Sequence, residues 1–120
     1  MAKIQWNADY RGVEVQTKTE HFVVSDLPSC AMSWHDAKRF TKDTRVSGWD
    51  IPTKEQLGAI AYYLQVINDL MDQNHGYQIY RPHWADERDD HYAWYVNVGN
   101  RDLSYANKYT VVNVRLVKTL

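Results

Sequence analysis

The segment that most constrains the fold runs from Gly48 to Leu57 and is Gly-Trp-Asp-Ile-Pro-Thr-Lys-Glu-Gln-Leu. Thr53 takes the N-cap position of a predicted helix, and Gln56 follows three residues later, which is the spacing of a capping box. Pro52, directly before the cap, prevents the helix from extending backwards. The glycine and Trp49 indicate a turn packed by an aromatic ring. The segment therefore predicts a turn followed by a helix that begins at a defined residue.

The sequence predicts two helices. Ser33 caps the first, which places Trp34, Ala37 and Phe40 on its buried side. The polar residues of this helix form its solvent-exposed face: Lys38, Arg39, Lys42 and Asp43. The second helix begins at Thr53 and ends before Gly76, which is a stop signal. Its apolar residues recur with helical spacing and form one buried stripe: Leu57, Ile60, Ala61, Leu64, Ile67 and Met71.

Strands are predicted in both halves of the chain. Residues 11–24 form two short strands, because their β-branched residues are Val13, Val15, Val23 and Val24. Residues 92–98 alternate as a two-sided strand, and the turn Gly99–Asp102 follows. Residues 111–117 form the last strand, with Val112, Val114 and Leu116 on one face and Arg115 on the other. Helices followed by an antiparallel sheet indicate the α+β class.

Three segments in fixed order carry a resemblance to a known family: Gly48–Leu57, Ala93–Gly99 and Val114–Lys118. In that order and at that spacing, residues 30 to 118 resemble the Lcl-type C-terminal domain family of bacterial and phage modules. Four further residues match the pattern of that family: Trp34, Ala37, Asn107 and Lys108. The resemblance implies a C-type-lectin-like fold, similar also to formylglycine-generating enzymes, in which two helices pack on a small twisted antiparallel sheet with long loops. We expect one such domain over residues 1–120.

The sequence departs from this family at positions that bear on function. Many members carry a cysteine pair that looks like a disulfide, whereas the corresponding positions here hold Phe40, or a neighbour, and Leu116. The segment Tyr80–Asp86 replaces the Tyr-Trp-Ser-Ser-Thr run of the family, beside the expected binding loops. The sequence contains none of the Glu-Pro-Asn, Gln-Pro-Asp or Trp-Asn-Asp motifs by which C-type lectins bind sugar through calcium. Formylglycine-generating enzymes need two active cysteines, and Cys30 is the only cysteine of this chain.

Composition limits the size, the compartment and the partners. A chain of 120 residues with 44% hydrophobic content is long enough to bury one core. Its net charge of −1 gives no general attraction to nucleic acid or to an anionic membrane. A single cysteine and the lack of a signal peptide or a membrane span predict a cytoplasmic protein. Nine Tyr and five Trp favour either β-sheet cores or recognition surfaces.

The densest polar cluster consists of His83, Asp86, Glu87, Asp89, Asp90 and His91. Carboxylates and imidazoles could bind a divalent cation, but the spacing matches no EF-hand loop. A solvated acidic loop is the preferred interpretation, and an acidic contact surface for a basic partner is the alternative. No metal and no cofactor are therefore predicted.

Two further features have simple interpretations. Cys30 lies a few residues before a helix, whose field could lower the pKa of a thiol, but no histidine is spaced to pair with it. A buried or incidental thiol is expected. A local basic patch lies near Trp34 and Trp49 and consists of Lys38, Arg39, Lys42 and Arg45. It lacks any base-reading motif, so nucleic acid is not an expected partner.

Together these observations predict a non-catalytic binding module in which a rigid frame holds the loops of residues 74–108. We expect the partner to be a protein, with a phage or mobile-element product acting on a host protein as one setting. The alternatives are a glycan-binding module and a small enzyme that uses the His/Asp cluster. The expected partner-binding residues are large rings, imidazoles and arginines: Tyr80, His83, Trp84, Arg88, His91, Tyr92, Arg101 and Tyr105.

Overall fold

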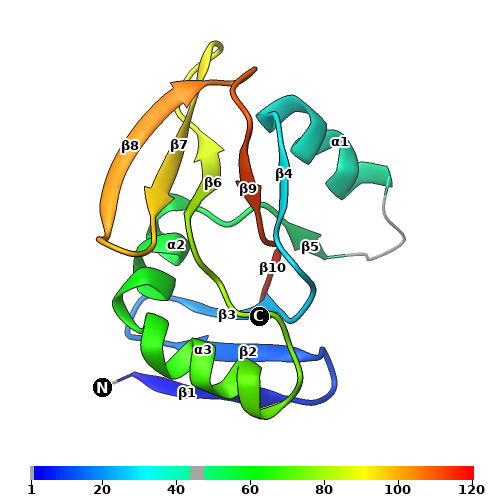
Figure 1. The fold of residues 1–120 in the computed structure, drawn as a ribbon, viewed down its shortest axis with the longest axis vertical. Coiled ribbons are helices and arrows are strands. Elements are labelled where there is room, and N and C mark those ends of the chain that lie inside the picture. Colours follow the sequence, from blue (N-terminus) through cyan, green and yellow to red (C-terminus); the bar gives the residue numbers. More distant parts are fainter. Residues whose placement is uncertain (1, 44–47) are drawn as a thin grey trace.

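Three helices and ten strands form the part of the chain that this computed structural model describes, residues 2–43 and 48–120 (Figure 1). The helices are α1 (Trp34–Asp43), α2 (Lys54–Tyr62) and α3 (Leu64–Gln73). The α+β class is thus confirmed. The side chains of Lys42 and Asp43, and the whole of Arg45, lie outside the described part, so the expectations for them stay predictions.

The first sheet has the strand order β1-β2-β3-β10-β5 and is antiparallel throughout. Its strands are β1 (Lys3–Asn7), β2 (Gly12–Gln16), β3 (His21–Ser25), β10 (Val117–Thr119) and β5 (Trp49–Asp50). The prediction of two strands between residues 11 and 24 is confirmed. Strand β1 was not predicted, although Ile4 and Trp6 alternate in it and pack against the core.

The second sheet has the order β4-β9-β6-β7-β8. Its strands are β4 (Cys30–Met32), β9 (Val112–Val114), β6 (Pro82–Glu87), β7 (Tyr92–Asn97) and β8 (Asp102–Asn107). The pairing of β6 with β9 is parallel and the other pairings are antiparallel. The expected single small sheet with two helices is therefore wrong, because the described residues form three helices and two sheets. Strand β7 was predicted, whereas β6 and β8 occupy residues that were expected to lie in loops.

The predicted second helix is divided at Tyr63, whose backbone angles are φ −104° and ψ 25°. Helix α2 packs on β6 and β7 of the second sheet, whereas α3 packs on β1 and β2 of the first. A continuous helix would run in one direction, whereas packing on both sheets requires two helices with different directions. The division occurs at Tyr63 while the bond from the Tyr63 N–H to the Ala59 carbonyl is kept (3.1 Å).

The predicted last strand is also divided, because its two halves join different sheets. Val112–Val114 pairs with β4 of the second sheet, and Val117–Thr119 pairs with β3 and β5 of the first. Arg115 and Leu116 form the crossover between them. Arg115, which the alternation placed on the opposite face to its neighbours, is buried.

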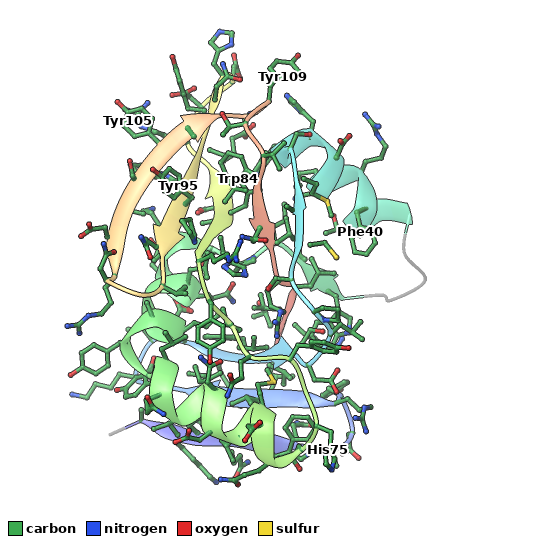
Figure 2. The ribbon with its side chains drawn as sticks, viewed as in Figure 1. Phe40, His75, Trp84, Tyr95, Tyr105 and Tyr109 are labelled. Atoms are coloured by element: carbon green, nitrogen blue, oxygen red, sulfur yellow. The ribbon has the colours of Figure 1, made fainter. Side chains whose placement is uncertain are left out.

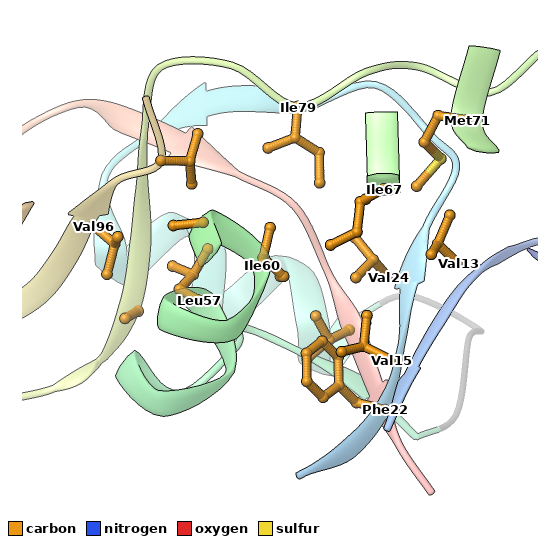
Figure 3. Close-up of a cluster of buried hydrophobic side chains, with 14 residues drawn as sticks. Val13, Val15, Phe22, Val24, Leu57, Ile60, Ile67, Met71, Ile79 and Val96 are labelled. Carbon is orange, nitrogen blue, oxygen red and sulfur yellow. The ribbon is translucent and has the colours of Figure 1, made fainter. Parts of the chain in front are cut away.

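The core consists of two clusters. The larger lies between the first sheet, α2 and α3, and Figure 3 labels these of its side chains: Val13, Val15, Phe22, Val24, Leu57, Ile60, Ile67, Met71, Ile79 and Val96. The smaller joins α1 to the second sheet: Trp34, Ala37, Ile51, Trp84, Ala93 and Val114. The predicted helical stripe is thus confirmed at every position except Leu64, which is half-buried. Phe40 was expected to be buried and is 46% exposed.

The helix ends follow local sequence signals. Thr53 Oγ1 accepts from the Gln56 N–H (3.1 Å) while Gln56 Oε1 accepts from the Thr53 N–H (2.9 Å), which confirms the capping box. At the end of α3, the Gly76 N–H bonds to the Met71 carbonyl and His75 has φ 62°, so His75 takes the left-handed position of a Schellman motif. No helix within the described ranges is long and apolar enough to cross a membrane.

Candidate functional site

Two of the predicted binding residues lie in the core. His83 and Trp84 have no exposed surface, because β6 is a central strand covered on both faces. The Trp84 indole donates to the Met32 carbonyl (2.9 Å), and its ring meets Tyr95 edge-on at 6.4 Å (Figure 2). The assignment of His83 and Trp84 to a binding surface is therefore wrong.

His83 belongs to a buried polar network with Ser29 and Arg115. Its Nδ1 lies 3.0 Å from the Arg81 carbonyl, which can only accept, so Nδ1 carries the proton. Its Nε2 then accepts from the Ser29 hydroxyl at 2.6 Å. The same hydroxyl oxygen accepts from Nε of Arg115 (3.0 Å). We call these three side chains the Arg115 network.

The guanidinium of Arg115 joins segments that are far apart in the sequence. Nη1 donates to the carbonyls of Ser25 (2.9 Å) and Tyr77 (2.7 Å), and Nη2 donates to that of Gln78 (3.0 Å). Burial lowers the pKa of Arg115 to about 10, which still leaves it charged at neutral pH. Arg115 thus holds the end of β3, the segment between α3 and β6, and the segment between β3 and β4. Its sequence context gave no sign of this role.

The contact between Ser29 and His83 has the distance of a nucleophile and its base, but not the required chemistry. Burial lowers the pKa of His83 from 6.5 to about 4, whereas a general base works best near the ambient pH. His83 has no exposed surface, and the Ser29 oxygen already accepts from Arg115. His91 lies exposed in the turn between β6 and β7 and does not join His83. The hydrogen bonds of Ser29 and His83 therefore have a structural role: they link the segment before β4 to β6.

The acidic run is exposed at Glu87, Asp89 and Asp90, as the prediction of a solvated loop requires, and three of its carboxylates also bond to neighbouring residues. Asp86 accepts from the N–H of Lys54, the first residue of α2 (2.9 Å), where the helix field favours negative charge. Glu87 pairs with the buried Lys108 (2.5 Å). Asp89 accepts from the N–H groups of His91 and Tyr92, and these bonds lower the pKa of its carboxyl.

These carboxylates do not converge. Within residues 2–43 and 48–120, no three His, Cys, Asp or Glu side chains come together in a way that could hold a metal ion.

An exposed cluster of one arginine and three rings lies on β7, β8 and the turn before β7. The guanidinium of Arg88 lies 4.1 Å from the ring centre of Tyr105 and 5.5 Å from that of Trp94. Tyr105 meets Tyr92 edge-on at 5.5 Å and Trp94 edge-on at 5.9 Å. Tyr92 and Tyr105 are 38% and 47% exposed. We call Arg88, Tyr92, Trp94 and Tyr105 the aromatic–arginine patch; Figure 2 labels Tyr105 on its outer strand.

The position of α2 decides which part of this sheet face stays exposed. Lys54, at the start of α2, lies 5.7 Å over the Trp94 ring. Tyr62, at the other end of α2, lies 5.5 Å from the guanidinium of Arg101. The helix therefore runs along β7 from Trp94 toward the turn between β7 and β8. Tyr92 precedes the covered part and remains at the surface.

The eight predicted site residues thus separate into distinct groups. Arg88, Tyr92 and Tyr105 come together in the patch, and the structure adds Trp94, which is half-buried. Tyr80 is exposed and bonds to Gln78 Oε1 in the segment before β6. Arg101 lies at the opposite end of β7. The alternation Tyr92–Trp94 in a strand was the available signal for Trp94.

Cys30 is exposed, so of the two expected states, a buried or an incidental thiol, the buried one is wrong. It lies at a cavity of about 490 Å³ between the first sheet and α1. The lining is mostly apolar, and Leu27 and Phe40 are the most exposed of its large hydrophobic side chains. Cys30 Sγ contacts the Pro28 carbonyl at 3.8 Å.

The basic patch near α1 is partly neutralised by its neighbours. Lys38 pairs with Asp50 (3.3 Å) and Arg39 with Asp36 (3.3 Å). Trp34 is buried, and its indole donates to the Ala85 carbonyl (2.9 Å), so its ring cannot stack on a base.

Comparison with protein-family models finds no match to this chain, and comparison with curated proteins also finds none.

Proposed function

We propose that this chain is a non-catalytic binding module that recognises a macromolecular partner, most directly a protein, through the aromatic–arginine patch. The observation that carries the proposal is the exposed guanidinium of Arg88 stacked on Tyr105 at 4.1 Å and beside Trp94 at 5.5 Å. Arginine and large aromatic side chains are the residue types that dominate protein interfaces energetically. The patch replaces the loops of residues 74–108 as the proposed contact surface.

The patch is also held in place before any partner arrives. Trp94 and Tyr105 are directly opposite each other in the β7–β8 ladder. Arg88 is fixed by its ion pair with Asp89 (2.7 Å), and the Arg88 N–H bonds to the Tyr92 carbonyl (3.0 Å). Side chains that are already ordered lose little entropy on association, which favours affinity.

A non-catalytic role is supported by the state of the Ser29–His83 pair. Its imidazole is neutral and enclosed, and its hydroxyl is engaged by Arg115. We further propose that the fold is C-type-lectin-like and related to the Lcl-type C-terminal domain family. Support comes from the three segments that carry the resemblance, because they meet in the core: Leu57, Val96 and Val117 belong to one cluster. A cytoplasmic setting and a host protein as the target rest on the sequence alone.

Affinity capture from a bacterial lysate tests the proposal when wild type and variants are compared in parallel. Arg88→Ala and Tyr105→Ala should each weaken capture of a specific partner by about 1–4 kcal/mol, the range of interface hot spots. Arg101→Ala is the matched control, since Arg101 also stacks on a tyrosine but lies outside the patch. Melting temperatures should stay close to wild type in all three variants. A partner that is captured equally by the patch variants would contradict the proposal, and a saccharide on a glycan array that needs Tyr105 would favour the glycan alternative.

A further inference from the structure

Strand β8 is an open edge of the second sheet. The sheet order ends with β8, and within residues 2–43 and 48–120 no strand pairs with its outer side (Figure 1). It spans six residues, whereas β4 at the opposite edge has three and β5 at the edge of the first sheet has two. Strand β1, the remaining edge, has five residues and is packed against α3. The longest edge strand of the described structure is therefore the one beside the patch.

The backbone groups that point outward from β8 follow from the hydrogen bonds at its end. The Lys108 N–H donates to the His91 carbonyl (3.0 Å), and these residues are opposite each other in the β7–β8 register. In an antiparallel ladder, pairs that exchange such bonds alternate with pairs that do not. Ala106 and Ser104 therefore bond to β7. Leu103 and Tyr105 direct their N–H and C=O groups away from it.

A second observation supports this assignment. The Tyr92 carbonyl accepts from the N–H groups of Arg88 and Asp89, on the β6 side of β7. The backbone groups of Tyr92 thus do not face β8, in agreement with the alternation.

This edge lacks the features by which proteins usually block strand addition. Edge strands are commonly protected by lysine, proline, a bulge or short length. The sequence of β8 is Asp-Leu-Ser-Tyr-Ala-Asn, and its six pairs with β7 are in unbroken register. The irregularity in this sheet lies between Trp84 and Glu87 of β6. Leu103 and Tyr105 are 49% and 47% exposed, so the edge also presents apolar surface.

We propose that β8 accepts an extended segment of a partner protein as an additional strand, with the aromatic–arginine patch selecting its side chains. This inference rests on the proposed function and names the form of the partner. The added strand bonds to the outward groups of Leu103 and Tyr105, and its alternate apolar side chains pack beside the side chains of these two residues. A carboxylate on the segment meets Arg88, whose ion pair with Asp89 uses Nη1 alone among its nitrogens.

Charge selects the chemistry of the added segment. A second copy of β8 would bring Asp89 and Asp102 as well as its own Arg88, so a second copy is an outcome that the experiment below separates by its dependence on protein concentration. An acidic extended segment meets the guanidinium with opposite charge.

Random peptides of about twelve residues, long enough for one strand and its flanks, are the probe. After display selection on the whole wild-type chain, we expect bound peptides to alternate apolar residues and to carry an acidic one. Leu103→Pro removes the outward N–H and should lower the affinity of these peptides about tenfold or more. One hydrogen bond to the added strand is lost, and the proline ring obstructs the edge of β8. Leu103→Ala is the matched control, because it removes the same side chain and keeps the N–H. Peptide binding should also slow amide hydrogen exchange at Leu103 and Tyr105 in the wild type.

The outcomes separate the two proposals. One outcome would overturn strand addition and leave the proposed function standing. In it, Arg88→Ala lowers the affinity of the selected peptides, Leu103→Pro does not, and peptide binding leaves amide hydrogen exchange at Leu103 and Tyr105 unchanged. If Leu103→Pro does not fold, the exchange measurement on the wild type decides alone. If the Tyr105 amide becomes protected from hydrogen exchange as the protein concentration rises, in the absence of peptide, a second copy occupies the edge and the inference is overturned. Failure to select any peptide that needs β8 would also overturn it, and lysate capture would still test the patch.

Discussion

The stability of this protein should depend on pH through His83. Burial holds the pKa of His83 at about 4, compared with 6.5 for the exposed side chain. Between these values the unfolded chain binds a proton that the folded chain does not, so folding stability falls as the pH falls from 6.5 to 4 and levels off below. At about 1.4 kcal/mol per pH unit, the difference between the two pKa values lowers the free energy of unfolding by about 3 kcal/mol. The physical cause is the loss of hydration, together with the nearby charge of Arg115.

Urea unfolding at several pH values between 7 and 4 measures this effect, and His83→Gln is the matched variant. Glutamine keeps hydrogen-bonding groups but does not titrate, so its stability should change less over the same range even if it is lower at pH 7. Carboxyls whose pKa values are lowered by their partners, such as Glu14 and Glu55, titrate in both proteins and cancel in the comparison. Equal pH dependence in the two proteins would refute the assignment of His83 as a buried neutral imidazole.

Three further predictions concern stability. Trp84→Ala should cost about 3–5 kcal/mol in urea unfolding because Trp84 is fully buried, whereas Tyr105→Ala should cost far less; equal costs would contradict their placement. His75→Gly should raise the free energy of unfolding by about 0.5–1 kcal/mol, since glycine suits the left-handed end of α3, and a lower melting temperature would argue against the Schellman motif. Leu64→Ala should cost less than Ile67→Ala, because Leu64 is half-buried, and the reverse order in urea unfolding would place the division between α2 and α3 elsewhere.

Local signals were sufficient to predict the helix starts and several strands. The capping box at Thr53 and the cap at Ser33 each depend on residues within three positions of one another. Alternation likewise predicted β7, because its two faces meet different clusters: Val96 joins the larger and Ala93 the smaller. These elements could be predicted because each is determined by neighbours in the sequence.

The missed features depend on which sheet a segment joins. The apolar stripe from Leu57 to Met71 has uninterrupted helical spacing, and only the change from one sheet to the other divides it at Tyr63. Residues 112–119 alternate as one strand would, yet Arg115 crosses between sheets and turns inward to carbonyls more than thirty residues away in sequence. No short-range pattern distinguishes such an arginine from a solvated one.

The residues named from the sequence for a binding surface lie together only in part. Arg88, Tyr92 and Tyr105 were named because arginines and rings favour recognition, and they do lie together. His83 and Trp84 were named by the same argument, but β6 turned out to be central in its sheet. Whether a ring faces solvent or core depends on what covers the strand, and this is a property of the assembled sheet.

The position of the patch follows from the helix start that dominates the sequence. Thr53 ends the backward extension of α2, so the helix first covers the sheet at Trp94, beneath Lys54. Beyond that point no described helix packs on this face of β7, and Tyr92 stays accessible beside Tyr105. Asp86, which is half-buried near the end of β6, accepts from the N–H of Lys54 and so links the start of the helix to this strand. The capping signal thus sets the boundary between the covered frame and the exposed rings, and the same few residues that determine the fold also determine where the proposed contact surface lies.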